Sequence, residues 1–497
     1  MPALDQLETN PIGTPPPGAA SLAGAPLPDA PAPPVPTPAF WASVREALAG
    51  SHHDFSTGPL GRAILLLAVP MVLEMAMESV FAVTDAYFVG RLGADALATV
   101  GLTESMLAVV YALAMGLGVG ATAVVARRTG EKDPAGAARA GATAVAMGVA
   151  LSLVLGTAGA LLAPRLLALM GAPPGVLATG TSYARVMLGG EASIILLFVA
   201  NAIFRGAGDA AIAMRTLWLA NGINIVLGPL LIFGPGPFPA LGVTGAAVAT
   251  TIGRSTGALY ALWRLTRPTS RVRVARRDFA FDRAVVGRIV EVSGAAAAQS
   301  MIGTASWIGL VRVMATFGAP ALAGYTIAMR IIVFAILPAF GMSNAAATLV
   351  GQALGARDPA RAERAVWTTG HYNAAFLGAL AVVFVVAAPA LVGVFTRDPA
   401  VLHYATNGLR VDALGFPLYA YGLVLAAAFN GAGDARTPTV LNLLVFWAFE
   451  IPVAYGLAVG LGMGPQGVFV AIALAFSMLA VASGGVFRRG RWKTQVV

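Results

Sequence analysis

Cysteine and charge are what this sequence lacks. None of its 497 residues is cysteine, which excludes disulfide bonds, thiolate catalysis and cysteine-ligated metal sites. Charged residues make up 11% of the chain, whereas a soluble domain carries about 25%. Hydrophobic residues account for 58%, and the mean hydropathy is +0.78. An ordinary soluble protein is therefore excluded, and the composition indicates a protein embedded in a membrane.

Long stretches without charge predict how the chain crosses that membrane. About 20 apolar residues span the hydrocarbon core as a helix, and no Asp, Glu, Lys or Arg occurs in 140–164, 292–311, 331–356 or 365–396. These stretches are too long for barrel strands, so we predict an all-α integral membrane protein. Twelve spans are expected, starting near residues 62, 101, 138, 181, 211, 241, 287, 321, 370, 409, 437 and 466.

The N-terminal residues have a different composition. Residues 1–57 are rich in Pro and Ala and lack the basic start and unbroken apolar run of a signal peptide, so we predict a disordered cytoplasmic tail. Within it, the amphipathic string FWASVREAL either touches the membrane surface or is a plain linker. The remaining predicted segments are an N-terminal six-helix lobe at 58–265, a basic cytoplasmic linker at 266–286, a C-terminal six-helix lobe at 287–488 and a cytoplasmic tail at 489–497.

Basic residues cluster in the even-numbered connections between spans, for example at 127–132, 264–277, 357–364 and 488–493. Odd-numbered connections such as FGPGPFPALG carry no charge. By the positive-inside rule, both termini are expected to be cytoplasmic, in the plasma (inner) membrane. The net charge of +9 is spread over these short clusters, so it does not indicate nucleic-acid binding.

Two nearly identical strings, FRGAGDA at 204–210 and FNGAGDA at 429–435, lie 225 residues apart. The same register pairs Gly93 with Gly318 and Asp133 with Asp358, which points to an internal repeat. With six spans in each half, the halves should be related by an axis along the membrane normal. Two such bundles could rock about a central cleft, as a transporter requires.

The repeated string also has a structural explanation. Glycine can end one helix in a left-handed conformation, and the aspartate can cap the next helix. We therefore expect structural turns formed by Gly206, Gly208, Asp209, Gly431, Gly433 and Asp434. The alternative is an intramembrane aspartyl protease, because Gly-x-Gly-Asp also marks such enzymes and a symmetric aspartate pair could share a proton.

The strongest functional signal is three carboxylates in the first span, Glu74, Glu78 and Asp85. At 100° per residue they share one stripe of the helix, which cannot face lipid. They could instead pair with buried cations such as Arg312 or Arg330. A desolvated carboxylate can be occupied by a proton, Na⁺ or an organic cation in turn. Further polar candidates inside the spans are Asn201, Asn221, Asn224, Thr250 and Gln299.

The chain resembles multidrug and toxic compound extrusion (MATE) transporters. The resemblance rests on TDAYFVGRLGADALATVGL, GVGATAVVARRTGEKD, FRGAGDA and FNGAGDA, in that order along residues 60–490. It implies two six-helix lobes arranged in a V, and export of cationic amphipathic compounds in exchange for H⁺ or Na⁺. It further implies no enzymatic activity, no cofactor beyond the coupling cation, small organic cations as substrates, and a monomer in the bilayer.

The resemblance also assigns roles to residues. Asp85 occupies the position of a coupling carboxylate, and Asn224 and Thr250 match partners that would hold Na⁺ beside it. The second acidic position of that set is occupied by Gly228. Another branch of the family uses acids on spans seven and ten, where this chain has Gly303 and Tyr419. We therefore hypothesise that Glu78 or Glu74 supplies the missing carboxylate.

A flippase of lipid-linked oligosaccharide or polysaccharide is the main alternative function. Such a protein could share the architecture, but it is expected to line its cleft with cationic side chains for phosphate. An ATP-driven pump is not supported, because the sequence contains no Gly-x-x-x-x-Gly-Lys-Ser/Thr string.

Overall fold

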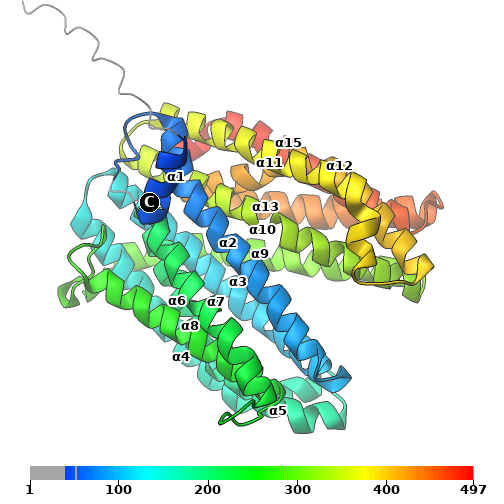
Figure 1. Ribbon diagram of the computed structural model, residues 1–497. Coiled ribbons are helices and arrows are strands. Elements are labelled where there is room, and N and C mark those ends of the chain that lie inside the picture. Colours follow the sequence, from blue (N-terminus) through cyan, green and yellow to red (C-terminus); the bar gives the residue numbers. More distant parts are fainter. Residues whose placement is uncertain (1–39, 51–52, 281, 496–497) are drawn as a thin grey trace, which may run out of the picture. The chain divides into compact units, whose positions relative to one another are not determined.

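The computed structural model describes residues 40–50, 53–280 and 282–495, and within these ranges it is helical without strands (Figure 1). The elements are α1 (Phe40–Ala49), α2 (Leu60–Gly90), α3 (Ala94–Gly130), α4 (Pro134–Leu169), α5 (Pro174–Gly189), α6 (Glu191–Gly206), α7 (Ala210–Phe233), α8 (Val243–Thr266), η1 (Arg276–Phe279), α9 (Arg283–Ala315), α10 (Ala319–Gly355), α11 (Pro359–Gly393), α12 (Pro399–Gly431), α13 (Arg436–Asn442), η2 (Leu443–Glu450), α14 (Ile451–Tyr455), η3 (Gly456–Gly460), α15 (Pro465–Arg488) and η4 (Arg491–Thr494).

Ten helical stretches are long and apolar enough to cross a membrane, with α5–α6 and α13–η3 each counting as one. Helices α8 and α9 have 24 and 33 residues and are more polar, and they complete the twelve spans. We call α2–α8 the N-terminal half and α9–α15 the C-terminal half. Most spans begin before the predicted residue, and the largest difference is at α11, which starts at Pro359 instead of near 370.

Helix α1 falls inside the stretch 1–57 that was predicted to be disordered. Phe40–Ala49 is helical, with Ser43 and Ala47 buried, so the prediction is wrong for these ten residues. Arg215 on α7 donates hydrogen bonds to the carbonyls of Leu48 and Ala49, which fixes the end of α1. Residues 53–57 are described as well, and Phe55 among them is buried, whereas residues 1–39, 51 and 52 lie outside the described residues.

The internal repeat is visible in the backbone. Asp133 accepts a hydrogen bond from Gly136 N at the start of α4, and Asp358 accepts one from Arg361 N at the start of α11, both at 2.8 Å. The residues before these caps, Lys132 and Arg357, both have positive φ angles, 57° and 60°. Equivalent turns therefore adopt the same unusual conformation 225 residues apart. We call the end of the bundle that carries these turns the basic end.

The two halves meet at the basic end through a reciprocal contact. A Cβ on Gly130 of α3 would collide with the carbonyl oxygen of Gln352 on α10, and a Cβ on Gly355 of α10 would collide with that of Arg127 on α3. Adding 225 to Gly130 and Arg127 on α3 gives Gly355 and Gln352 on α10, so each glycine meets the repeat equivalent of the residue that lies three positions before it on its own helix. Such exchange is what a two-fold interface produces, and it supports the predicted relation between the halves.

Each half also lends its first helix to the other half. α2 packs against α10, where Gly341 lies against the backbone of Met71, and α9 packs against α3, where Gly116 lies against the backbone of Ser293. Small residues allow helices to approach closely in a membrane. In Figure 1, α10 runs beside α2 and α3. The two lobes are therefore joined by direct helix contacts, α2 with α10 and α9 with α3.

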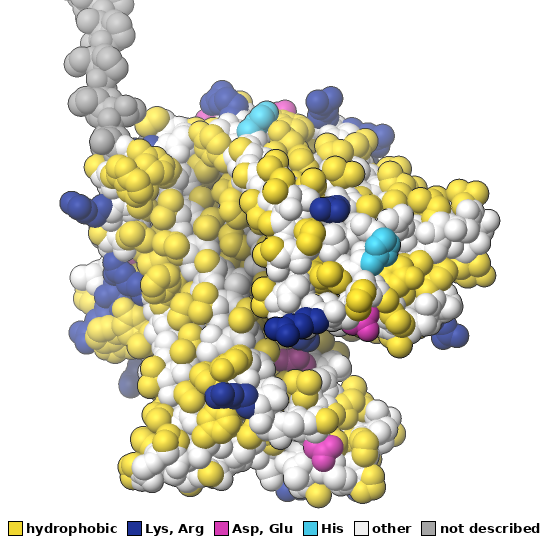
Figure 2. All heavy atoms as spheres, turned by 45° about the vertical axis from the view of Figure 1, so that its right-hand side comes forward, with side chains coloured by type: hydrophobic (Ala, Val, Ile, Leu, Met, Phe, Trp, Pro, Cys, Tyr) yellow, Lys and Arg dark blue, Asp and Glu magenta, His cyan; other side chains and the backbone are white. Residues whose placement is uncertain are grey.

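Apolar side chains are spread over the face seen in Figure 2 and charged side chains are few there, as expected for a surface in contact with lipid. Large exposed hydrophobic residues include Leu153, Val154 and Leu161 on α4 and Val382 and Val386 on α11. Inside the halves, small residues dominate the core, with Ala123, Ala140 and Ala202 fully buried. Close helix packing then leaves space for polar side chains only at defined positions.

Candidate functional site

The three acids of the first span lie on α2, which is a continuous helix from Leu60 to Gly90. Glu74 is buried, and Glu78 and Asp85 are half-buried. Helix geometry places Glu78 about 6 Å beyond Glu74 and Asp85 about 10 Å beyond Glu78, going away from the basic end. The structure confirms that these acids occupy a shared helix but gives each of them different partners.

Glu74 is part of a buried ion pair. Its Oε1 lies 2.7 Å from Nη1 of Arg205 and 3.2 Å from Nδ2 of Asn201, both on α6. The side chain of Arg205 is 14% exposed and that of Glu74 is 2% exposed, so little water screens the pair. Pairing with a cation was one of the two expected roles for this glutamate, but the partner is Arg205, not Arg312 or Arg330.

Glu78 is paired as well, and its partner was missed at the sequence level. Arg254 on α8 donates from Nη2 to Oε1 of Glu78 at 3.1 Å, and Asn221 on α7 donates to Oε2 at 2.9 Å. The Arg254 side chain is 4% exposed, and its guanidinium lies 5.5 Å from the ring centre of Phe81 and 5.8 Å from that of Tyr111. An arginine in the middle of an apolar span needs such partners, and that signal was present in the sequence.

Asn224 and Thr250, the two residues that the resemblance assigns to an Na⁺ site, are in contact. Nδ2 of Asn224 donates to Oγ1 of Thr250 at 2.7 Å, and both residues are buried. Asn224 lies one helical turn from Asn221, and Thr250 one turn from Arg254, in each case away from the basic end. The pair therefore lies on the same side of the Glu78 network as Asp85.

Asp85 differs from the other two acids. Among the described residues it forms no hydrogen bond and no ion pair, although Arg254 and Glu104 act on it electrostatically. The structure brings Asn224 and Thr250 together and shows no direct contact from either to Asp85. Of the α2 acids, Asp85 alone keeps its carboxylate oxygens without a partner in the described part of the chain.

Gln299 lies elsewhere. Its Oε1 accepts a hydrogen bond of 3.3 Å from Nδ2 of Asn430, so it joins α9 to the end of α12 in the C-terminal half. We expected Gln299 to share a cavity with the α2 acids, but no described contact joins Gln299 to any of them. Its role in the structure is to hold the second Gly-x-Gly-Asp turn.

The two Gly-x-Gly-Asp turns have the geometry of structural turns. Gly208 and Gly433 have φ angles of 82° and 86°, which favour glycine. Asp434 caps α13, since its Oδ1 accepts from Thr437 N at 3.3 Å and its Oδ2 from Thr437 Oγ1 at 2.7 Å. Asp209 stands at the N-cap position of α7, but its side chain makes no capping hydrogen bond, so that part of the prediction is wrong.

Packing explains the first glycine of each turn. Gly206 lies against Thr122 of α3, and Gly431 lies against Ala347 of α10, in each case too closely for a side chain. Nε2 of Gln352 donates to the carbonyl of Gly206 at 2.9 Å, so the first turn also contacts the C-terminal half. Both turns thus position the helices where the halves meet.

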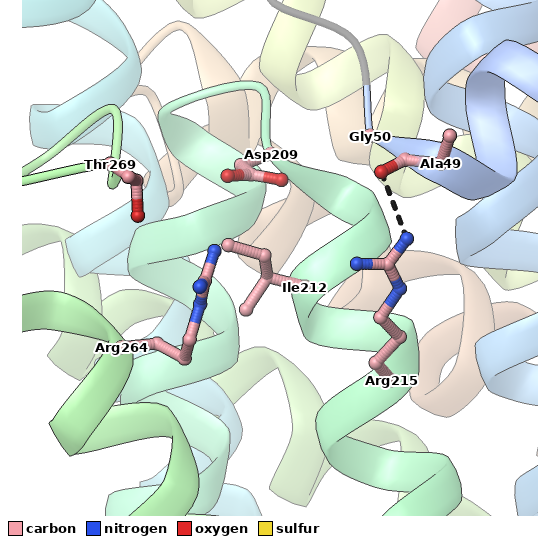
Figure 3. A pocket seen from close by; sticks show the side chains of 7 residues that line it. All are labelled: Ala49, Gly50, Asp209, Ile212, Arg215, Arg264 and Thr269. Atoms are coloured by element: carbon pink, nitrogen blue, oxygen red, sulfur yellow. Dashed lines mark hydrogen bonds between the residues drawn. The ribbon is translucent and has the colours of Figure 1, made fainter. Parts of the chain in front are cut away.

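A small polar pocket adjoins the first turn (Figure 3). Its lining residues come from α1, α7, α8 and the connections between them: Ala49, Gly50, Asp209, Ile212, Arg215, Arg264 and Thr269. Arg215 points to the carbonyl of Ala49, and Arg264 approaches from the opposite side. Asp209 therefore lies among arginines, and the second aspartate that a protease would need is 225 residues away on the other turn.

Known proteins give the same answer. The family model MatE matches residues 70–230 and 294–456. A probable multidrug resistance protein NorM from Caulobacter vibrioides is 30% identical over 427 residues, which are 82% of this chain and 87% of that protein. A solved structure of a multidrug resistance MATE family transporter in an outward-facing conformation is 27% identical, with a TM-score of 0.83 over 89% of this chain and 98% of that one.

A MOP superfamily transporter from Pyrococcus furiosus, described with a reverse polarity of its binding pocket, is equally similar: 27% identity, a TM-score of 0.83 and the same coverage. These similarities confirm the predicted fold, an all-α membrane protein with twelve spans in two six-helix lobes. Since the relatives are transporters, the protease interpretation is wrong. The chain is an integral membrane protein without enzymatic activity, and it belongs to the MATE family of transporters.

Proposed function

We propose that this protein is a secondary active multidrug exporter, which moves cationic amphipathic compounds out of the cell in exchange for H⁺ or Na⁺ by alternating access. The observation that carries this proposal concerns Asp85. This acid lies within a membrane span, and no Lys, Arg or His among the described residues forms an ion pair with it. Intramembrane acids without a structural partner mark ion and substrate pathways.

A carboxylate with little access to water is stabilised when a cation neutralises it. At Asp85 that cation can be a proton, Na⁺ or the charged group of a substrate. Because one carboxylate cannot hold all of them at once, binding of the coupling ion and binding of the substrate exclude each other. Competition of this kind is the thermodynamic requirement for antiport.

We assign positioning roles to Glu78 and Glu74. Arg254 and Arg205 already compensate their charges, so neither carboxylate gains as much from an incoming cation as Asp85 does. Asn221 and Arg254 fix Glu78, and through α7 and α8 they also hold the contact between Asn224 and Thr250. If Na⁺ is the coupling ion, Asp85, Asn224 and Thr250 are the residues that would bind it.

The test is efflux of a fluorescent organic cation from proteoliposomes under a proton gradient or a sodium gradient, imposed separately. Asp85→Asn should abolish efflux under the gradient that drives the unmodified protein. Asp95→Asn is the matched control, because Asp95 is an exposed acid in the first turn of the next helix and should not matter. Efflux at the unmodified rate by Asp85→Asn would contradict the role of this residue.

One observation favours the alternative of a lipid-linked sugar flippase. Arg254 is a buried guanidinium inside the N-terminal half, and such a group could meet phosphate. Its present partner Glu78 would have to release it first. If neither gradient moves the dye and a lipid-linked pyrophosphate sugar crosses the same vesicles, the flippase replaces the exporter as the better proposal.

The location of the protein is part of the same proposal. Export by an ion gradient requires the plasma (inner) membrane, and the arginine-rich connections would place both termini in the cytoplasm. The basic end then faces the cytoplasm. The halves of a single chain contain everything that the proposed cycle needs, so we expect it to work as a monomer.

A further inference from the structure

A second pair of acids lies in the C-terminal half. Asp412 is on α12 and Glu450 ends the π-helical segment η2, and their exposed fractions are 0% and 2%. They interact electrostatically with each other and with Tyr325 on α10. Neither is at the positions of Gly303 and Tyr419 discussed above, and neither is connected to the α2 acids by a described contact.

These acids have no partner among the described residues. Both carboxylate oxygens of Asp412 and Oε2 of Glu450 are buried without a hydrogen bond, and so is the hydroxyl oxygen of Tyr325. No described Lys, Arg or His forms an ion pair with either acid, in contrast to Glu74 and Glu78. The nearest arginine in sequence, Arg410, instead donates to the carbonyl of Val385 at 3.0 Å.

Two ionised carboxylates cannot remain together in such a place. An isolated buried ion costs several kcal/mol or more even after the protein relaxes, and two like charges repel. Glu74, which is equally buried, has Arg205 beside it, whereas Glu191 on α6, 1% exposed, has no ion pair among the described residues either. The missing compensation must therefore come from something that the chain itself does not supply: a shared proton or a bound cation.

The backbone nearby offers a further oxygen atom. Pro417 on α12 has no N–H for the carbonyl of Ala413, four residues earlier in the helix. This carbonyl is one residue away from Asp412 in sequence. The π-helical segment that ends at Glu450 is also a rare conformation that occurs frequently at functional sites. Carboxylate and carbonyl oxygens are suitable ligands for a hard cation.

We propose that Asp412 and Glu450 together bind one monovalent cation, H⁺ or Na⁺, and form a second cation site in the C-terminal half. Tyr325 interacts electrostatically with both acids and Tyr419 with Glu450, and the ring of Tyr419 is stacked on that of Phe476 with ring centres 3.9 Å apart. With Asp85 in the other half, each half of the repeat then holds one exchangeable cation. This consequence for the number of ions per cycle rests on the proposed function, whereas binding to the pair does not.

The test measures binding to the purified protein and needs no transport. The melting temperature is followed while NaCl replaces KCl at constant ionic strength. If the pair binds Na⁺, the slope of Tm against log[Na⁺] should persist in Asp85→Asn and fall in Asp412→Asn and Glu450→Gln, by about half if both halves bind Na⁺ equally. Asp412→Glu, which keeps the carboxylate, should retain the slope.

A pair that carries a proton gives a different result. Na⁺ then leaves the slope unchanged, and the infrared signal of protonated carboxyl groups at neutral pH should decrease in Asp412→Asn and in Glu450→Gln. Asp398→Asn is the control, because Asp398 is an exposed N-cap on the same helix. Where Asp412→Asn does not fold, Glu450→Gln gives the same readouts.

The proposal is overturned if Glu450→Gln and Asp412→Asn change neither the Na⁺ slope nor the infrared signal. That outcome would leave the efflux proposal untouched, because Asp85→Asn is tested by dye transport. Loss of dye efflux in Asp85→Asn with no effect of the C-terminal pair on binding would assign a single cation site to this protein.

Discussion

Arg254 and Glu78 show how a membrane protein keeps a charged pair without water. The rings of Phe81 and Tyr111 and the carboxylate of Glu78 lie around the guanidinium, and Asn221 donates to the other oxygen of the same carboxylate. A buried pair is a weak source of stability compared with an apolar pair, but removing one partner leaves an uncompensated charge. The two residues should therefore behave as a unit under mutation.

We expect Glu78→Gln to destabilise the protein by about 3–5 kcal/mol, since Arg254 would remain buried without its carboxylate. The double variant Glu78→Gln with Arg254→Gln should recover much of that loss. The measurement is thermal unfolding in detergent, arranged as a double-mutant cycle. Glu131→Gln breaks the partly exposed pair with Arg128 and should cost less than about 1 kcal/mol. If the losses of unfolding free energy in Glu78→Gln and Arg254→Gln simply add in the double variant, the two residues do not act as a unit.

At the level of single residues the sequence was informative about position and less so about partners. The helical stripe of Glu74, Glu78 and Asp85 follows from a fixed angle per residue, so it could be predicted. Arg205 and Arg254 lie 131 and 176 residues from the glutamates they bind. Their meeting depends on how α6 and α8 pack against α2, which periodicity does not specify.

At the scale of helices, the positions of the helix ends were predicted least accurately from the sequence. α12 begins at Pro399, ten residues before the predicted start near 409. With the later start, Asp412 counts as a residue at the membrane edge; with the observed start it lies well inside the helix. The charges at Arg397 and Asp398 belong to the cap of α12, since Oδ1 of Asp398 accepts from Ala400 N at 2.8 Å. In the sequence, these charged residues of the helix cap were interpreted as part of a longer loop, which moved the predicted start of the helix too far along the chain.

Glycine positions between helices were predictable only in part. The turn glycines were expected from the repeated string, but Gly130 and Gly355 matter for another reason, because the two halves touch there. We expect Gly130→Ala or Gly355→Ala to force α3 and α10 apart and to lower Tm by several degrees, since the obstructing atoms belong to backbone. The readout is the melting temperature in detergent.

Gly287→Ala is the matched control for those variants. Gly287 lies in α9 with no atom within 4 Å of an added Cβ, and alanine is the better helix former. Its Tm should stay the same or rise. If Gly130→Ala melts at the temperature of Gly287→Ala, the contact between the halves at the basic end is looser than the structure indicates.

On the scale of the whole molecule, the segment before α2 links the two halves. Arg215 on α7 of the N-terminal half and Arg271 in the connection after α8 donate to the carbonyls of Leu48, Ala49 and His53. Arg361 of the C-terminal half donates to the carbonyls of Phe55, Thr57 and Gly58 at 3.1, 2.9 and 2.9 Å. Any motion that separates the halves at the basic end must break one of these two sets.

Arg361→Ala removes three charge-assisted hydrogen bonds, each worth about 1.5–3 kcal/mol. We expect faster proteolysis between residues 53 and 58 and a lower Tm. Arg364→Ala, an exposed arginine one turn further along α11, should change neither. Deletion of residues 2–39 should also leave Tm and efflux unchanged, because the contacts just described begin at residue 48. Unchanged proteolysis in Arg361→Ala would show that the segment is held by other contacts.

The exchange of first helices between the halves has a consequence for biosynthesis. Until α9 has left the ribosome, the face of α3 around Gly116 and Gly120 has no covering helix, and α2 has no α10 to lie against. The first six spans would therefore remain partly unpacked in the lipid until α9 and α10 have been inserted. Neither half is expected to complete its packing alone, because the N-terminal half is fully packed only after the C-terminal half has been synthesised.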